Sequence, residues 1–287
     1  MKWFNWGKKK PTDESLFIKK ARSTEFMLAY DTDLYNKFKQ EFETWIHSSV
    51  QEVCGLPGPS YITNGITEAL DQTYALYKKI GIFEGEYGYH ELVLPKKRLT
   101  QNLKTADCII VSHPFSADGM SAHEKLAYAD SFNKPIFVDC AFFGICQHQS
   151  FDFTSYKNIH SVAFSLSKVF GSGWHRVGML YTKDAYPISV TDKWNYQILS
   201  SVERHYGLLS KVGPDDIPAY YKQSQIDICN RNDLLVSDTV IFGIDTQNKY
   251  SKIYERGKTN RICISKILEL ENKSFLRSKN IPKVTLK

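Results

Sequence analysis

The chain has 287 residues, of which 42% are hydrophobic and 14% aromatic, and its formal net charge is +6. That composition supports a sizeable core, while no apolar run is long enough to cross a bilayer and the amino-terminal segment lacks the apolar core of a signal peptide. We therefore expect a soluble cytoplasmic protein with one large domain and a smaller appendage.

Residues 1–40 are polar with scattered aromatic side chains, and we expect an amino-terminal arm that leads into a helix. Apolar residues at helical spacing from Leu34 onward predict a helix over 34–53. The stretch GLPGPS ends it. A short strand, a turn at Asn64-Gly65 and a second helix follow.

Short apolar runs then alternate with helical segments, a pattern typical of a mostly parallel sheet covered on both faces. We expect an α/β fold with a three-layer α/β/α large domain. Its helix is SAHEKLAYADSFN, and its expected strands are ELVLP, ADCIIVSHP, KPIFVDCAF, HSVAFSLSK and RVGMLYTK.

The carboxyl-terminal part is predicted to be helical over 192–225, and SDTVIFGID and RICISKIL then suggest a small α+β domain. We expect three parts in all. They are the arm over 1–40, a large cofactor-binding domain over 41–221 and a small carboxyl-terminal domain over 222–287.

The six cysteines form no Cys-x-x-Cys pair, so we expect buried free thiols rather than disulfides, and no metal site. The mild basic excess lacks the stripe typical of nucleic-acid binding, so we expect neither a nucleic acid nor a membrane as partner. An anionic small ligand would suit the charge.

Chemistry-bearing residues gather where the predicted strands end: Asn64-Gly65, His113, Asp139 and Lys168. In open α/β sheets, ligands bind at the carboxyl ends of the strands. A lysine at a strand end is ordinarily a surface group. Here two serines precede it, glycines follow, and Arg176 stands eight residues later at the start of the next strand. A charge there requires an anion to hold.

The stretch FSLSKVFGSGWHRVGML resembles the cofactor-lysine segment of the fold-type-I pyridoxal-phosphate enzymes, in particular the class I/II aminotransferase family. That family has Ser-x-Ser-Lys, an arginine eight residues later, and then Val-Gly, as this chain does. The resemblance implies that Lys168 is catalytic and forms a Schiff base with the aldehyde of pyridoxal 5'-phosphate. Ser165 and Arg176 would bind its phosphate.

Two earlier segments resemble the same family, although each position alone is compatible with an ordinary structural role. TNGITEAL resembles the phosphate cup, which implies that Gly65, Ile66 and Thr67 offer backbone amides and a hydroxyl to the phosphate. EGEYGYHEL resembles the segment whose aromatic residue stacks on the pyridine ring, and Tyr87 is the candidate.

Three further segments complete the resemblance. VSHPFSADG places His113 where the family has an asparagine that contacts the phenolic oxygen, and imidazole can still donate a hydrogen bond. FVDCAFFG implies that Asp139 pairs with the pyridine nitrogen, and Phe142 replaces a tyrosine, which loses a contact. KTNRICIS implies that Arg261 binds the substrate carboxylate.

The resemblance implies an aminotransferase that acts on an amino acid and a keto acid and forms a homodimer. The same parts also serve decarboxylases, lyases and cyclases. The segment between Lys168 and Arg261 is short, so a cofactor-binding homologue with little catalysis stays open too. We expect the Lys168 amine to be buried, and the sequence does not identify the substrate side chain.

Overall fold

The computed structural model describes residues 33–183 and 198–271. The chain divides into two compact units, Met1–Leu34 and Tyr35–Lys287. Most of the arm expected over 1–40 therefore lies outside the described residues, and the fold below is that of the second unit. Within 33–183 and 198–271, no helix has the length and apolarity that crossing a membrane requires.

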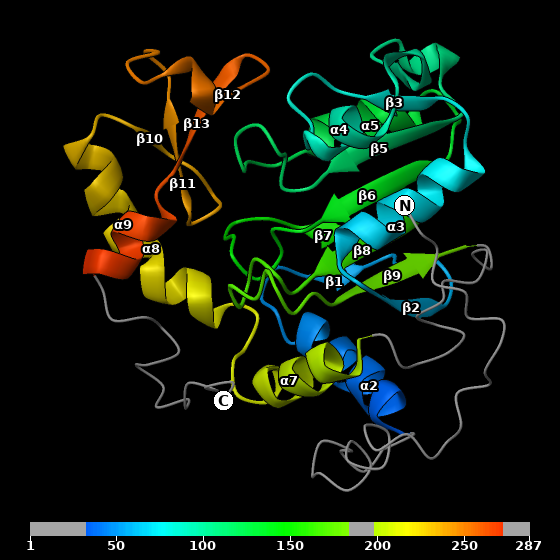
Figure 1. The fold of residues 1–287 in the computed structure, drawn as a ribbon, viewed down its shortest axis with the longest axis horizontal. Helices are drawn as coiled ribbons and strands as arrows, with labels where there is room; N and C mark the ends of the chain where they lie inside the picture. The colour runs from blue at the N-terminus through cyan, green and yellow to red at the C-terminus, as the bar shows by residue number, and fades with distance from the viewer. Residues whose placement is uncertain (1–32, 184–197, 272–287) are drawn as a thin grey trace, which may run out of the picture. The chain divides into compact units, whose positions relative to one another are not determined.

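The second unit is built around a seven-stranded sheet, made of β2 (Ser60–Thr63), β3 (Ile80–Ile82), β4 (Leu99–Thr100), β5 (Cys108–Ser112), β6 (Ile136–Cys140), β8 (Ile159–Ser165) and β9 (Gly178–Thr182). Their order across the sheet is β2-β9-β8-β6-β5-β3-β4 (Figure 1). Only β9 pairs antiparallel, with β8 on one side and β2 on the other. The prediction of a mostly parallel sheet is confirmed.

Helices cover both faces of this sheet, as expected for three layers. Helix α3 (Ile66–Leu76) buries Ala69 and Leu70 in a cluster that includes Ala163 of β8. The next residue along β8, Phe164, points to the opposite face. There it meets Phe42 of α2 (Leu34–His47) edge-on, with ring centroids 6.0 Å apart. Burying such a phenylalanine contributes about 2–3 kcal/mol.

The shorter elements of this part frame the sheet. They are the two-stranded parallel pair β1 (Val53–Cys54) and β7 (Phe151–Asp152), α4 (Tyr89–Val93), α5 (His123–Asp130), η1 (Lys96–Arg98) and η2 (Leu103–Thr105). The helix α5 lies where the sequence predicts it, and it packs against β5.

The prediction of a strand at ELVLP is wrong, because residues 89–93 form the helix α4, in which Leu92 is 82% exposed. A short apolar run does not by itself distinguish a strand from a helix. The sequence prediction missed β3 at 80–82 instead. Its Gly81 lies so close to its neighbours that an added methyl group would stand 2.9 Å from the Ala106 Cβ.

The carboxyl-terminal part confirms the expected α+β composition. Its four-stranded antiparallel sheet has the order β10-β11-β13-β12. The elements are α7 (Leu199–Leu209), α8 (Asp216–Arg231), β10 (Leu235–Val236), β11 (Phe242–Asp245), η3 (Lys252–Tyr254), β12 (Glu255–Arg256), β13 (Thr259–Cys263) and α9 (Ser265–Glu271). The expected domain boundary at 221/222 falls inside α8, and residues 192–197 of the expected helical stretch lie outside the described residues.

Hydrogen bonds connect this part to the parallel sheet. Ser237 Oγ donates to the Asp118 carbonyl at 2.6 Å, and Thr239 Oγ1 donates to the Gly119 carbonyl at 2.9 Å. The buried Gln225 of α8 holds the same segment from behind, because its amide donates to the Ser237 and Thr239 carbonyls. We call residues 237–239 the clasp.

All six cysteines are free thiols, as predicted. Four are buried, whereas Cys54 is half-buried and Cys263 is exposed, so the prediction of burial holds only in part. In the described part of the chain, no three histidine, cysteine, aspartate or glutamate side chains are grouped to hold a metal ion.

Candidate active site

The antiparallel pairing of β8 and β9 explains the spacing between Lys168 and Arg176. The chain leaves the carboxyl end of β8, turns, and re-enters the sheet at the adjacent end of β9, so both residues lie at the same edge. The Leu166 amide donates to the Val177 carbonyl at 3.1 Å and closes the base of this turn. Farther out, Ser172 Oγ lies 2.8 Å from His205 Nε2, so α7 anchors the loop.

Arg176 joins the turn to the start of α3. Its Nη2 donates to Thr67 Oγ1 at 3.1 Å, and its Nε lies 3.4 Å from the Asn64 carbonyl. Gly65 caps α3 with a φ of 72° and offers no side-chain cap. The first amides of a helix lack intrahelical partners and favour an anion, and a guanidinium beside them adds to that preference.

A glycine on β9 allows these segments to meet. An added methyl group on Gly178 would stand 2.4 Å from the Phe164 carbonyl and 3.1 Å from the Gly65 Cα. Two serines lie beside this close approach. Ser165 Oγ accepts a hydrogen bond from the Ser167 amide at 3.3 Å. The Ser167 hydroxyl is buried without a partner among the described residues.

Asp139 is the last residue but one of β6 and is 4% exposed. Its Oδ1 accepts from the Ala141 amide at 2.9 Å. Burial raises the pKa of this carboxyl to about 6, against the opposing effects of the Ala141 amide and the Lys168 charge. A buried carboxylate that accepts one hydrogen bond from the described residues is poised to accept a cationic partner.

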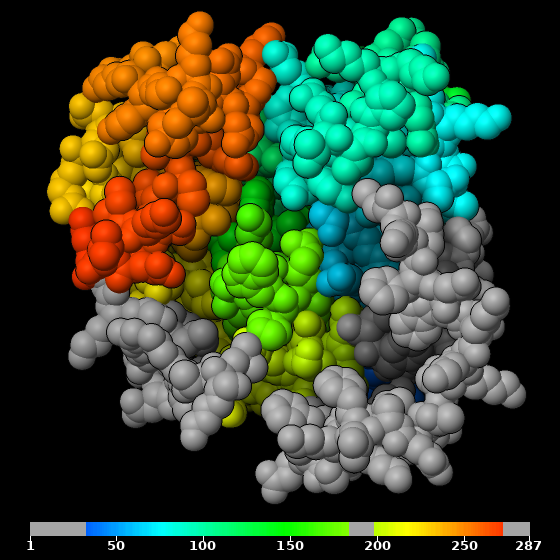
Figure 2. All heavy atoms as spheres, in the orientation of Figure 1, coloured from blue at the N-terminus to red at the C-terminus, as the bar shows by residue number. Residues whose placement is uncertain are grey.

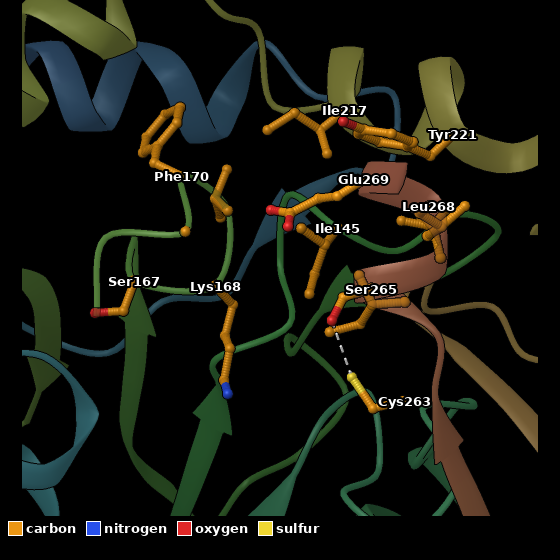
Figure 3. A pocket seen from close by; sticks show the side chains of 14 residues that line it. Ile145, Ser167, Lys168, Phe170, Ile217, Tyr221, Cys263, Ser265, Leu268 and Glu269 are labelled. Carbon is orange, nitrogen blue, oxygen red and sulfur yellow. Dashed lines mark hydrogen bonds between the residues drawn. The ribbon is translucent and has the colours of Figure 1, made fainter. Parts of the chain in front are cut away.

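Lys168 is exposed, so the expectation of a buried amine is wrong. The reason is its position on the walls of two adjoining cavities, into which the long side chain extends (Figure 3).

Tyr87 belongs to a group of residues organised by the buried carboxyl of Glu86. Ser112 donates to Glu86 twice, from its amide at 2.8 Å and from its hydroxyl at 2.6 Å. The Ser116 amide in turn donates to Ser112 Oγ at 2.8 Å, and the Tyr87 amide donates to Glu86 at 3.2 Å. Burial raises the pKa of Glu86 to about 7, although the bonds from Ser112 oppose the rise.

Arg261 reaches the same place from β13 of the carboxyl-terminal part. Its guanidinium lies 4.2 Å from the centre of the Phe242 ring and donates to the Ser116 carbonyl. Phe242 also meets Phe142 edge-on, with centroids 5.2 Å apart. Burial lowers the pKa of Arg261 to about 10, and the group remains a cation at neutral pH.

These side chains line one cavity of about 280 Å³ at the carboxyl ends of the strands. Figure 2 shows the surface hollowed between the carboxyl-terminal sheet (orange) and the residues that follow β3 (teal). The structure brings nine predicted site residues to the cavity wall: Ile66, Thr67, Tyr87, Asp139, Phe142, Ser165, Lys168, Arg176 and Arg261. Gly65 adjoins them as the cap of α3.

His113 is not among these wall residues. Its side chain is fully buried, with Nε2 2.8 Å from the Ser150 carbonyl and Nδ1 accepting from the Ala122 amide. Both ring nitrogens are thus engaged elsewhere, which argues against the contact expected from the resemblance. Burial also lowers the pKa of this imidazole to about 4.

The wall includes residues that the sequence prediction passed over, chiefly Ser112, Ser116, Ser167 and Cys263. Ser112 could have been found from the strand-end rule, because it ends β5 and pairs in register with Asp139. Cys263 gave no such signal, since it comes from the separate antiparallel sheet.

No family model matches the sequence, and no curated protein matches it. Several solved structures are similar to this chain in fold. A PLP-bound C-S lyase from Staphylococcus hominis, complexed with L-cycloserine, superposes with a TM-score of 0.60 at 13% identity, over 86% of this chain and 79% of the other.

Two aminotransferase structures are similar to the same extent. A probable N-succinyldiaminopimelate aminotransferase from Thermus thermophilus gives a TM-score of 0.60 at 13% identity, over 92% of this chain and 89% of the other. Histidinol-phosphate aminotransferase from Clostridium acetobutylicum gives 0.56 at 16% identity, over 86% and 90%. At such identities the likeness shows a shared fold.

Proposed function

We propose that this chain, which has the fold of the fold-type-I pyridoxal-phosphate enzymes, binds pyridoxal 5'-phosphate in the cavity around Lys168 and transaminates an amino acid. One observation carries the proposal. A single cavity wall combines an anion cradle, a primary amine, a buried carboxylate and a guanidinium. The aminotransferases and the PLP-bound lyase of the same fold support it.

The residues present fit such a group. The Ser167 hydroxyl is buried at the wall without a partner among the described residues, and a phosphate oxygen would satisfy it. The open amides at the start of α3 and the Arg176 guanidinium would hold the same anion. Tyr87 is 41% exposed on the wall and presents a ring that a flat aromatic group can stack on.

Each remaining residue has a role that follows from its chemistry. When bound, the cofactor supplies an aldehyde that condenses with amines and a ring that withdraws electrons. Lys168 Nζ would hold the aldehyde until a substrate amine replaces it, and the freed amine would then move the proton at the substrate α-carbon. Asp139 would be the anionic partner that keeps a proton on the ring nitrogen. Arg261 orients the substrate carboxylate, which decides the bond that lies in reach of Lys168.

The proposal extends to the partners of the protein. An amino acid and a keto acid are the small molecules it would exchange, and the resemblance implies a cytoplasmic homodimer. Because the similar structures include a C-S lyase as well as aminotransferases, elimination is the second candidate.

The test is borohydride treatment of the protein loaded with pyridoxal phosphate, followed by peptide mapping. We expect the label on Lys168, its loss in Lys168→Ala, and its retention in the control Lys97→Ala, which changes an exposed lysine of η1. Keto-acid-dependent formation of the pyridoxamine form would identify transamination. Release of ammonia with a pyruvate-like product would identify a lyase, and label on another residue would overturn the proposal.

A further inference from the structure

A second cavity, of about 330 Å³, adjoins the first at the cofactor lysine. Ser167, Lys168, Ile241 and Cys263 line both, so one space leads into the other. Figure 3 shows the Lys168 side chain on one wall and residues of α8, β13 and α9 on the other. The volume lies within the range of about 300–1,000 Å³ that small-molecule sites occupy.

The walls of this second cavity are mainly apolar. Five segments supply them: the loop after Lys168, helices α8 and α9, the loop after β6, and the two residues before β11. The apolar members are Ile145, Val169, Phe170, Ile217, Tyr221, Val240, Ile241 and Leu268. Glu269 is the acidic residue of the lining, and its carboxylate extends from α9 toward the loop that carries Lys168 (Figure 3).

The positions of Lys168 and Arg261 restrict where a substrate side chain can go. With the amino group at the cofactor, the carboxylate at Arg261 and the α-hydrogen facing Lys168, one direction remains at the tetrahedral α-carbon. Arg261 lines the first cavity but not the second, whereas Lys168 lines both. A side chain directed away from Arg261 and past Lys168 enters the second cavity.

A third cavity, of about 620 Å³, offers the opposite chemistry. It also contacts Arg261, and its lining includes the exposed side chains of Glu84, Glu91 and Glu255 together with Arg256, so carboxylates outnumber guanidiniums. A cationic side chain would suit it. Because that cavity lies on the Arg261 side, it adjoins the substrate carboxylate rather than the position left for the side chain.

We infer that the second cavity receives the side chain of the substrate, and that the substrate is an amino acid with an aliphatic or aromatic side chain. This inference rests on the proposed function. Apolar walls favour burial of carbon, at about 0.8 kcal/mol for each methylene group. Glu269 at the rim disfavours acidic side chains.

The test is a titration of the pyridoxal-phosphate-loaded protein with 2-aminobutyrate, norvaline and norleucine, followed by absorbance. Each added methylene group should tighten binding about fourfold, as the burial free energy implies. Lysine and glutamate, which place a charge at the end of a chain of similar length, should bind more weakly than norleucine.

Two variants test separately the apolar wall, through Ile217, and the acidic residue at the rim, Glu269. Ile217→Ala should reduce the affinity for norleucine about fourfold and leave 2-aminobutyrate unchanged. Its control is Leu270→Ala, which changes an 86% exposed residue of α9 outside the lining. Glu269→Lys should improve glutamate binding, whereas Lys266→Glu on the same helix, also outside the lining, should not.

The outcomes distinguish the two proposals. A protein that shows the borohydride label at Lys168 but no dependence on chain length, or a preference for lysine, overturns the inference alone. A protein without the label at Lys168 overturns the proposed function and the inference with it.

Discussion

Gly65 and Arg176 are in such close contact that a methyl group on Gly65 would stand 2.9 Å from Arg176 Nη2. The two residues are far apart in the chain, and they meet because β2 and β9 are neighbours in the sheet. The absence of a side chain at Gly65 therefore leaves the guanidinium room to lie beside the first turn of α3.

Gly65→Ala should weaken the binding of pyridoxal phosphate by about tenfold or more. The added methyl group displaces Arg176, and the left-handed φ of 72° costs an alanine roughly 1–2 kcal/mol. Absorbance titration measures the affinity. The control is Gly207→Ala in α7, where an added Cβ meets nothing within 4 Å and the helix gains about 1 kcal/mol. Equal affinity in Gly65→Ala and the wild type would show that this contact does not hold the phosphate.

Asp139→Asn should reduce turnover by about 10²–10³-fold or more, because an amide cannot balance a positive charge on the ring nitrogen. The fold should survive, since the asparagine side-chain oxygen can still accept from the Ala141 amide. Steady-state kinetics and thermal unfolding test both statements together. Asp227→Asn on the exposed surface of α8 is the control. Undiminished turnover in Asp139→Asn would remove this carboxylate from the chemistry.

Glu86→Gln should change how stability depends on pH. The folded-state pKa of Glu86 is raised from 4.5 to about 7 by burial. Between those values the folded chain holds a proton that the unfolded chain has released, so the free energy of unfolding falls as pH rises, by about 3 kcal/mol in all. Glutamine cannot ionise, so it removes this loss of stability at high pH. At low pH the wild type does not suffer the loss, because Glu86 is protonated in both the folded and the unfolded chain.

Urea denaturation of both proteins at pH 4.5 and pH 8 measures this difference. Relative to the wild type, Glu86→Gln should gain about 3 kcal/mol of stability between the two pH values, whatever constant penalty its altered hydrogen bonds impose. Glu124→Gln, on the surface of α5, should follow the wild type. Parallel curves for Glu86→Gln would mean that Glu86 titrates as an ordinary glutamate.

Arg98→Ala should destabilise the fold by about 1.5–3 kcal/mol. The Arg98 guanidinium donates to the Tyr74 carbonyl at 2.5 Å, the Tyr77 carbonyl at 2.7 Å and the Lys78 carbonyl at 3.0 Å, and so satisfies the carboxyl end of α3. Chemical denaturation is the measurement. The neighbouring Lys97→Ala should be neutral, and the same midpoint in both variants would contradict the capping role.

The parallel strands β5 and β6 were predictable because their burial is continuous. Every residue of β5 and β6 is buried, and such runs keep their apolar character whichever face each residue meets. The strand β3 was not predictable, because three residues with a central glycine carry too little hydrophobic signal. The apolar run after it belongs to α4.

The residues of the candidate site likewise divide into those that the sequence indicated and those that it did not. Asp139 lies next to the end of the buried strand β6, and Lys168 follows the buried strand β8, so the strand-end rule pointed to both. The Glu86 group escaped sequence reasoning, because its bonds depend on how the loop after β3 meets β5 in space. His113 shows the converse. Its place in the chain matched a contact position, but its ring turns toward Ser150.

The clasp at residues 237–239 bears on how molecules enter and leave. Hydrogen bonds tie it to the loop after β5, to Gln149 and to α8, and Phe242 and Arg261 stand on the strands that follow. These bonds restrict the movement of the clasp, and so of the strands that carry Phe242 and Arg261, relative to the loop after β5. Under the proposed function, binding of an amino acid should therefore be a single diffusive step, with a rate that scales inversely with solvent viscosity and carries no slow isomerisation phase.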